Sequence, residues 1–390
     1  MLRLHQSPTD PDFVQNPYPF YDQARAGGQL FWWEDYGAVC ATSYAAVMAL
    51  LKDRRLGREV PEGHTDPIPD RLRPFYDIEA HSMLELEAPR HTRLRSLVLR
   101  AFTSRRIMGM RAEVEALAHD LVDDFPEGDF DLLPAYCQRI PVIVICRLLG
   151  VPETMAGQLL DWSTAMVAMY QAGRTREVEA RAMAASTDFS EFLRGYIEER
   201  RSRPGEDLIT RLIAAEEEGE KLTTDELIST CILLLNAGHE ATVHAMGNAV
   251  KLLVEQDHRQ VDEDVVEECL RLDPPLHIFD RWVYEDLALF GHGFRRGDRV
   301  KCILGAANRC PDTFEDAARF DPNRDGVLST SFGGGIHFCV GAPLARMELL
   351  LGLRVLFERC PDLTLVTPPR YADVYHFHGL ERLMVSCRTP

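Results

Sequence analysis

Apolar and polar residues follow helical spacing over most of the middle of the chain. This spacing predicts successive helices from residue 107 to about 256, and another helix from about 342 to 358 with one broad apolar face. Period-two alternation marks two stretches, residues 30–42, with a turn at Tyr36-Gly37, and residues 281–304. These stretches predict a hairpin and a small β-sheet.

Prolines and glycines divide the pattern into segments. Residues 1–20 are rich in Pro and Asp, and we expect them to be irregular. Short helices are predicted over residues 18–26 and over residues 43–52, where Ser43 is a good N-cap. Four prolines within residues 61–74 predict a loop without regular structure. None of these breaks has the composition of a flexible interdomain linker.

One long predicted helix contains a glycine and a charged residue in its middle. It begins with a capping box, Thr223 to Glu226, and runs to about residue 256. Gly238 lies in its middle, where glycine costs about 1 kcal/mol against alanine, which suggests close approach of a ligand. Glu240 is a charged residue in an otherwise apolar segment, so it needs a partner or a function.

A glycine-rich stretch precedes the last predicted helix. Three consecutive glycines, residues 333–335, allow a tight turn, and Cys339 follows just before the helix start. Helix N–H groups and the helix dipole favour a thiolate there, and a thiolate is a good soft metal ligand. No second Cys or His stands at zinc-finger spacing, so we do not expect structural zinc. The alternative is a glycine turn in which Cys339 is a small buried hydrophobe.

Composition limits the classes of function. The chain has 390 residues and a net charge of −18, which argues against nonspecific nucleic-acid binding. Its ten cysteines are scattered, which favours a reducing compartment. The first residues contain no apolar signal region, and the longest apolar runs are too short to span a bilayer. We therefore expect a soluble cytoplasmic protein that binds neither nucleic acid nor membrane.

Three motifs resemble those of one family. Phe332 to Gly341 reads Phe-Gly-x-Gly-x-His-x-Cys-x-Gly, which resembles the heme-binding signature of the cytochrome P450 family, the heme-thiolate monooxygenases. Glu268-x-x-Arg271 followed by Pro-Pro resembles the second fixed signature of that family, and the stretch ending at Arg324 resembles the third. The resemblance covers nearly the whole chain in the right order.

The chain departs from the family in its oxygen-binding motif. Residues 236–242 resemble Ala/Gly-Gly-x-Asp/Glu-Thr, with the acid at Glu240. The position of the alcohol holds Ala241, and Thr242 lies one residue later, about 100° further around a helix. This departure puts the usual delivery of protons in doubt.

The resemblance implies a single heme-thiolate monooxygenase domain over residues 1–390. The implied fold is mainly α with small β-sheets, a triangular helical prism around a buried heme. Its helix-rich parts would cover about residues 90–275 and 340–360. Its β-rich parts would cover about residues 25–45, 280–305 and 365–390.

The resemblance also assigns roles to residues. Cys339 would bind the iron of heme b (iron protoporphyrin IX) and push electron density to favour O–O cleavage. His91 and Arg95, at i,i+4 spacing on one helical face, would bind heme propionates. His337 would do the same or would stabilise its loop.

The cofactor-binding set is His91, Arg95, Ala237, Arg281, Phe332, His337, Cys339 and Gly341. The catalytic set is Gly238, Glu240, Ala241 and Thr242. Within this set, Glu240 would relay protons through water. A separate set would be structural: Glu268, Arg271 and Arg324.

The implied reaction inserts one oxygen atom of O2 into a small organic substrate, with a natural-product intermediate as one candidate. Electrons would come from a ferredoxin and a ferredoxin reductase. Arg100, Arg105 and Arg106 are candidates for docking that partner, with ordinary surface charges as the alternative. Two other functions stay open, a peroxide-driven heme-thiolate enzyme and a non-enzymatic heme protein that senses a ligand.

Overall fold

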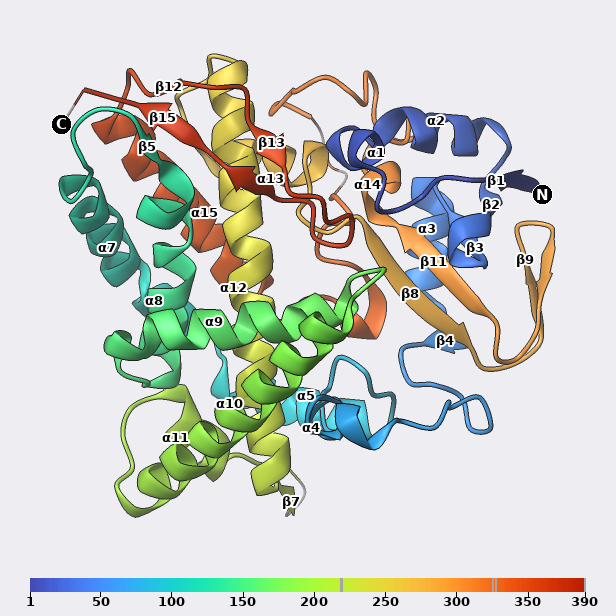
Figure 1. Ribbon diagram of the computed structural model, residues 1–390, viewed down its shortest axis with the longest axis horizontal. Helices are drawn as coiled ribbons and strands as arrows, with labels where there is room; N and C mark the ends of the chain where they lie inside the picture. Colours follow the sequence, from blue (N-terminus) through green and yellow to red (C-terminus); the bar gives the residue numbers. More distant parts are fainter. Residues whose placement is uncertain (218–219, 325, 327, 389–390) are drawn as a thin grey trace.

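Helices dominate the computed structural model, which describes residues 1–217, 220–324, 326 and 328–388. A helical part lies to the left in Figure 1 and a β-rich part to the right. The helices are α1 (Pro11–Gln15), α2 (Tyr18–Ala26), α3 (Tyr44–Lys52), α4 (Arg73–Glu79), α5 (Arg90–Ala101), α6 (Ser104–Gly109), α7 (Arg111–Asp123), α8 (Arg139–Leu149), α9 (Ala156–Val167), α10 (Arg176–Ser202), α11 (Leu208–Ala214), α12 (Thr224–Glu255), α13 (Glu263–Leu272), α14 (Leu304–Ala307) and α15 (Ala342–Arg359).

The strands are short and are grouped into small sheets. They are β1 (Leu2–Leu4), β2 (Leu30–Trp33), β3 (Ala38–Ala41), β4 (Leu56–Gly57), β5 (Phe130–Asp131), β6 (Glu216–Glu217), β7 (Glu220–Lys221), β8 (Ile278–Val283), β9 (Leu287–Leu289), β10 (His292–Phe294), β11 (Arg299–Ile303), β12 (Thr364–Leu365), β13 (Arg370–Tyr371), β14 (Leu380–Arg382) and β15 (Met384–Ser386). The combination of many helices and small sheets confirms the predicted mainly α fold class.

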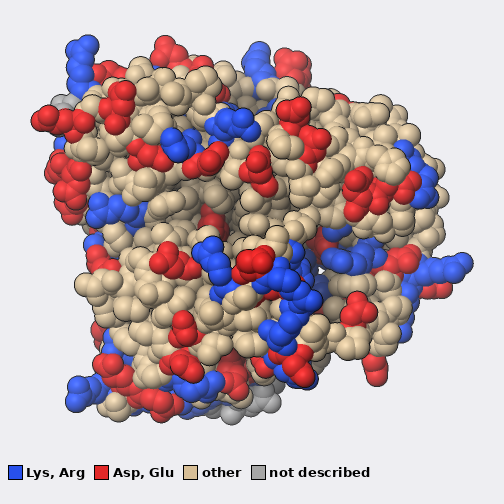
Figure 2. Space-filling model, viewed as in Figure 1, with Lys and Arg blue, Asp and Glu red and all other residues tan. Residues whose placement is uncertain are grey.

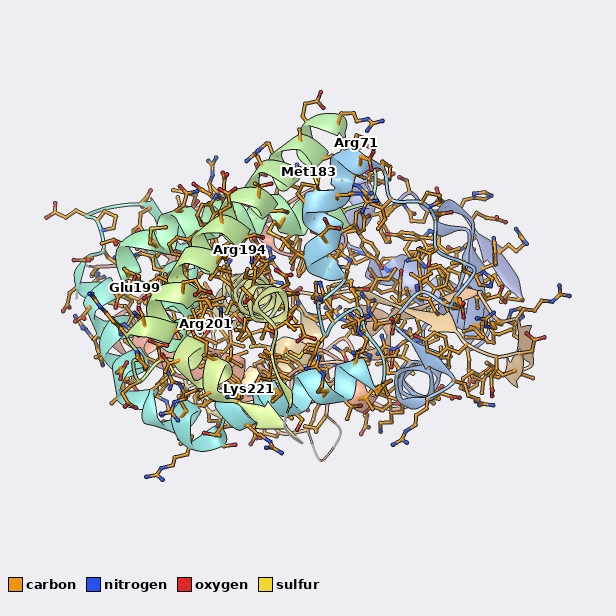
Figure 3. The ribbon with its side chains drawn as sticks, turned by 90° about the horizontal axis from the view of Figure 1, so that it is seen from below. Arg71, Met183, Arg194, Glu199, Arg201 and Lys221 are labelled. Carbon is orange, nitrogen blue, oxygen red and sulfur yellow. The ribbon has the colours of Figure 1, made fainter. Side chains whose placement is uncertain are left out.

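Helix α12 is the central element of the helical part (Figure 1). Its predicted capping box is present, because Thr223 accepts from the N–H of Glu226 while the Glu226 side chain accepts from that of Thr223. The helix packs against α8, α9, α10 and α15. Arg194 and Arg201 of α10 donate to Asp225 and Thr224 in the first turn of α12, and both arginines are visible along α10 in Figure 3.

The largest sheet joins segments that are far apart in the sequence. Its strand order is β1-β2-β3-β11-β8-β4. Strands β2 and β3 form the predicted hairpin, and β8 pairs with β11 as an antiparallel ladder within the predicted small sheet. Strand β11 also pairs with β3 in parallel, which connects the two predicted β regions in one sheet.

Two predictions of irregular structure are wrong. Residues 1–20 contain β1, which pairs in parallel with β2, and α1, whose N-cap Asp10 accepts from the N–H of Phe13. The proline-rich segment 61–74 contains a 3₁₀ turn at Asp70–Leu72 and the start of α4. Pro74 fits there because the first helical turn does not need its N–H.

A buried charge network fixes the approach to the glycine-rich loop. Arg271 donates twice to Glu268, at 2.6 and 2.7 Å, and Arg324 Nε lies 3.2 Å from Glu268 Oε1. Arg271 also donates to the carbonyl of Asn308 at 2.8 Å. Asn308 in turn donates to Ser331 Oγ at 2.9 Å. The network therefore holds the beginning of the loop that carries Cys339.

Among the described residues, no helix has both the length and the apolar character needed to cross a membrane.

Candidate active site

A cavity of about 1110 Å³ lies between α12 and the glycine-rich loop. Figure 2 shows a hollow in the middle of the molecular surface that it draws. The cavity wall includes residues of α5, α12, β8 and the loop 331–341. It therefore brings together most of the residues that the sequence singled out: His91, Arg95, Ala237, Gly238, Ala241, Thr242, Arg281, Phe332, His337, Cys339 and Gly341.

Cys339 differs from every other cysteine in the described part of the chain. Cys387 is half-buried, the other eight cysteines apart from Cys339 are buried, and Cys339 is exposed toward the cavity. Its N–H donates to the carbonyl of Phe332 at 3.1 Å, which closes the loop. The structure thus presents one thiol to the cavity, which does not fit the alternative of a buried apolar cysteine.

The glycines of this loop are required by its packing. Gly333 and Gly335 have φ angles of +71° and +69°, which favour glycine. A Cβ on Gly335 would lie 2.4 Å from the carbonyl oxygen of Leu51, at the end of α3. The close approach that the glycines permit is therefore to the backbone of α3.

Two opposing effects act on the Cys339 thiol. Although the thiol faces the open cavity, the protein atoms packed around it partly remove it from water, and this desolvation raises its pKa. The N–H groups of Gly341 and Ala342 and the charges of Arg95 and Arg346 act to lower the pKa. The helix start therefore acts in the predicted direction, but the desolvation outweighs it. A bound cation would favour the thiolate further.

Three basic side chains of the wall, His91, Arg95 and Arg281, have few protein partners. His91 is buried, its Nδ1 has no hydrogen-bond partner, and burial lowers its pKa to about 4. Arg95 donates to the carbonyl of Phe338 at 2.7 Å, and buried Arg281 donates to the carbonyl of Asp280 at 2.9 Å. Buried donors need acceptors, and guanidinium groups suit carboxylates. This set, together with Cys339, fits an iron porphyrin that carries two carboxylates.

His337 has a protein partner. Its Nε2 lies 2.8 Å from Glu87 Oε1, and its ring centroid lies 4.4 Å from that of His91. The contact with Glu87 ties the glycine-rich loop to the segment before α5. It supports the loop-stabilising role, and the second ring nitrogen leaves a propionate contact open.

The α12 wall is open where Gly238 lies. The nearest atom to a Cβ built on Gly238 would be Ile145 Cδ1, at 3.9 Å. Ala241 and Thr242 both line the cavity, so the offset of one residue does not remove Thr242 from the wall.

Glu240 is buried but does not line the cavity. Its Oε1 accepts from Thr164 Oγ1 at 2.8 Å, and its Oε2 lies 3.4 Å from His244 Nε2. Burial acts to raise the pKa of Glu240, but His244, His239 and Thr164 together bring it below its usual value. Sequence reasoning missed both polar partners, although His244 follows Glu240 at i,i+4 spacing.

Sequence reasoning also missed Glu348. This residue of α15 lines the cavity, is 2% exposed, and has no hydrogen-bond partner at Oε2. Burial raises its pKa to about 8. The signal was available, because Glu348 interrupts an apolar helix as Glu240 does.

The fold and the cavity-facing thiol define a heme-thiolate type of protein, and comparisons agree. The family described as "Cytochrome P450" matches residues 255–363. The chain is 34% identical over 407 residues to "Polyketide biosynthesis cytochrome P450 PksS" of Bacillus subtilis, covering 99% of both. It is 36% identical over 377 residues to "Cytochrome P450 monooxygenase PikC" of Streptomyces venezuelae, covering 92% of this chain and 87% of PikC.

Solved structures agree with these relatives. The crystal structure of P450BioI in complex with hexadec-9Z-enoic acid ligated acyl carrier protein matches with a TM-score of 0.91 and 30% identity, covering 97% of this chain and 100% of that one. The chain belongs to the cytochrome P450 family. It is a monooxygenase and an oxidoreductase, and the family implies a heme cofactor.

Proposed function

We propose that this protein binds heme b and inserts one oxygen atom of O2 into a small natural-product intermediate, with electrons from a ferredoxin and its reductase. The observation that supports this most is the position of Cys339, which lies on the cavity wall with Gly238 and Ala241 of α12 on the same cavity. The relative named for polyketide biosynthesis, PksS, supports the substrate class.

The residues of this chain would hold the cofactor in place. Cys339 would be the iron ligand, and His91, Arg95 and Arg281 would bind the propionates, with His337 as a further candidate. Phe332 would pack beside the ring, supported by Arg346, whose guanidinium lies 4.4 Å from the Phe332 ring centroid. Heme, when bound, supplies the dioxygen chemistry that side chains cannot. The network of Glu268, Arg271 and Arg324 would keep the loop in position.

Proton supply is the unusual step. Ala241 has no hydroxyl, and Glu240 lies behind the cavity wall, bound to Thr164 and His244. A water chain from Glu240 would have to pass this wall. A hydroxyl on the substrate and the hydroxyl of Thr242 are the sources that the cavity itself offers. We favour the substrate hydroxyl, since it explains how the protein functions with Ala241.

The electron partner would dock near α5 and α6. Arg105 is exposed there, whereas Arg106 donates to the carbonyls of Glu206 and Leu148. Arg100 also has a partner. Arg105 is therefore the first of the three arginines to substitute in a docking test.

One experiment separates this function from its alternatives. Purified protein is supplied with candidate substrates and either NAD(P)H, ferredoxin reductase and ferredoxin, or hydrogen peroxide alone. We expect product with the electron-transfer proteins and little with peroxide. Ala241 favours the peroxide-driven alternative, and product formed with peroxide alone would establish it. Absence of turnover in both arms, with ligand-dependent spectra retained, would favour a sensor.

A further inference from the structure

The cavity wall carries a group of charged residues, which lie just after β4, at and beyond the end of α4, and on strands β8 and β11. Two of its carboxylates have cationic partners. Glu85 accepts from Arg58, and Asp280 accepts from Lys301 at 2.8 and 3.0 Å. Asp280 also pairs with Arg299. All five side chains line the cavity.

Glu79, the last residue of α4, lines the same cavity without such a partner. The Tyr170 hydroxyl donates to its Oε2 at 2.8 Å, and no Lys, Arg or His in the described part of the chain pairs with it. Burial, followed by the charge of Glu85, raises the pKa of Glu79 to about 8. A carboxylate enclosed in this way ordinarily has a cationic partner.

The neighbours of Glu79 do not supply that cation. Arg58 is bound to Glu85, and its charge acts to lower the pKa of Glu79 without offsetting burial and the charge of Glu85. His376 stacks on Tyr170 with ring centroids 6.1 Å apart, but burial lowers its pKa to about 4, so it is neutral at pH 7. Tyr170, which donates to Glu79, lies edge-on to Phe75 with ring centroids 5.9 Å apart, and both rings line the cavity. Aromatic faces stabilise a nearby cation.

We propose that Glu79 anchors a protonated amine of the substrate, which the enclosed carboxylate and the adjacent aromatic rings of Tyr170 and Phe75 together recognise. The proposal rests on the monooxygenase function above and adds a substrate class, an apolar body that carries a basic amine. The apolar body matches the remaining wall, which includes Phe75, Met83, Ile145, Met169, Leu233 and Leu234.

The test uses three probes of equal chain length with the purified protein at pH 9, above the raised pKa of Glu79, so that this side chain is ionised. They are N,N-dimethyldecylamine, which is cationic, N,N-dimethyldecanamide, which is neutral, and decanoate, which is anionic. Isothermal titration calorimetry measures each affinity. We expect the amine to bind at least about tenfold more tightly than the amide, and decanoate to bind most weakly, since like charge repels.

Glu79→Gln keeps the shape and removes the charge. We expect it to weaken amine binding at least about tenfold and to leave amide binding unchanged. Asp77→Asn is the matched control, because Asp77 lies on α4, is exposed and does not line the cavity. It should leave both affinities within about twofold. Melting temperatures of both variants show whether the fold is retained.

Three outcomes overturn the proposal: equal binding of amine and amide to the native protein, tighter binding of decanoate, or amine binding unchanged by Glu79→Gln. The proposed function has a separate readout on the same samples, heme content and the spectrum of the reduced carbon-monoxide complex. Failure of that readout with the amine preference intact would overturn the monooxygenase function alone. An intact spectrum without amine preference would overturn only the role of Glu79.

Discussion

At the scale of single residues, Cys339 is set apart by what surrounds it rather than by its type. Nine other cysteines have the same thiol, but eight of them are buried, and Cys387 does not line the cavity. The loop glycines and the hydrogen bond to the Phe332 carbonyl hold Cys339 at the cavity wall. A single substitution therefore tests the site.

We predict that Cys339→His loses the red-shifted band of the reduced carbon-monoxide complex, because imidazole replaces thiolate as the iron ligand. The measurement is the difference spectrum of the reduced protein. Cys310→Ser, at a buried cysteine outside the cavity, is the control and should keep the band. Retention of the band by Cys339→His would mean that another residue is the ligand.

Ala241 supports a second prediction at this scale. With a substrate that carries a hydroxyl near the reacting carbon, we expect product formed per NAD(P)H to be high, and with the deoxy analogue we expect it to fall. Loss of one positioned donor costs on the order of 10²-fold in rate. Ala241→Thr should rescue the analogue by restoring a hydroxyl.

Thr242→Val provides the control for this prediction, because Thr242 is the other hydroxyl candidate on the same wall. It should leave coupling with the hydroxylated substrate unchanged if the substrate supplies the donor. Equal coupling for the substrate and its deoxy analogue in the native protein would exclude substrate assistance. Peroxide release is the measure of uncoupled turnover.

At the scale of elements, the ion pair of α13 connects several segments that meet only in the folded chain. Arg271 reaches the carbonyls of Asn308, Ala317 and Arg319 as well as Glu268. Glu268 also accepts from the N–H of Asp321 at 2.8 Å. The pair therefore fixes α13 against the segment that leads into the glycine-rich loop.

We predict that Glu268→Ala or Arg271→Ala lowers the free energy of unfolding by about 3–5 kcal/mol, because each leaves a buried charge without its partner. Little heme-loaded protein should be recovered. The measurements are urea unfolding and the ratio of heme to protein. Glu263→Gln, an exposed residue in the first turn of α13, should change stability by less than about 0.5 kcal/mol. Normal heme loading of either alanine variant would contradict a structural role.

At the scale of the whole molecule, stability should depend on buried histidines. His239 of α12 is 2% exposed, and neither ring nitrogen has a hydrogen-bond partner. Burial lowers its pKa from 6.5 to about 4. Between these two values the unfolded chain binds a proton that the folded chain does not, so stability falls as pH decreases from 6.5 toward 4.

We predict that His239→Leu removes about 2 kcal/mol of the stability difference between pH 7.5 and pH 5, which is the amount that this pKa shift implies. The measurement is the free energy of unfolding in urea at both pH values. His5→Gln, at an exposed histidine, should keep the native dependence. If His239→Leu kept the full pH dependence, other groups would account for it.

The sequence by itself determined the features that neighbouring residues encode. Capping at Thr223, the hairpin around Gly37 and the helix after Gly341 depend on residues within a few positions, so periodicity and turn chemistry predicted them. The motif around Cys339 indicated the family in the same way. These predictions are confirmed by the fold and by the relatives.

Only the tertiary structure decided which distant segments meet. Strand β1 forms because its backbone pairs with β2, and nothing within its own three residues signals that partner. Glu240 is enclosed by Thr164 of α9, and Glu79 by Tyr170, in each case across a large sequence separation. Local propensity is weak compared with the burial and pairing that the assembled fold imposes, so a carboxylate's partner, and with it its protonation, depends on the elements packed around it.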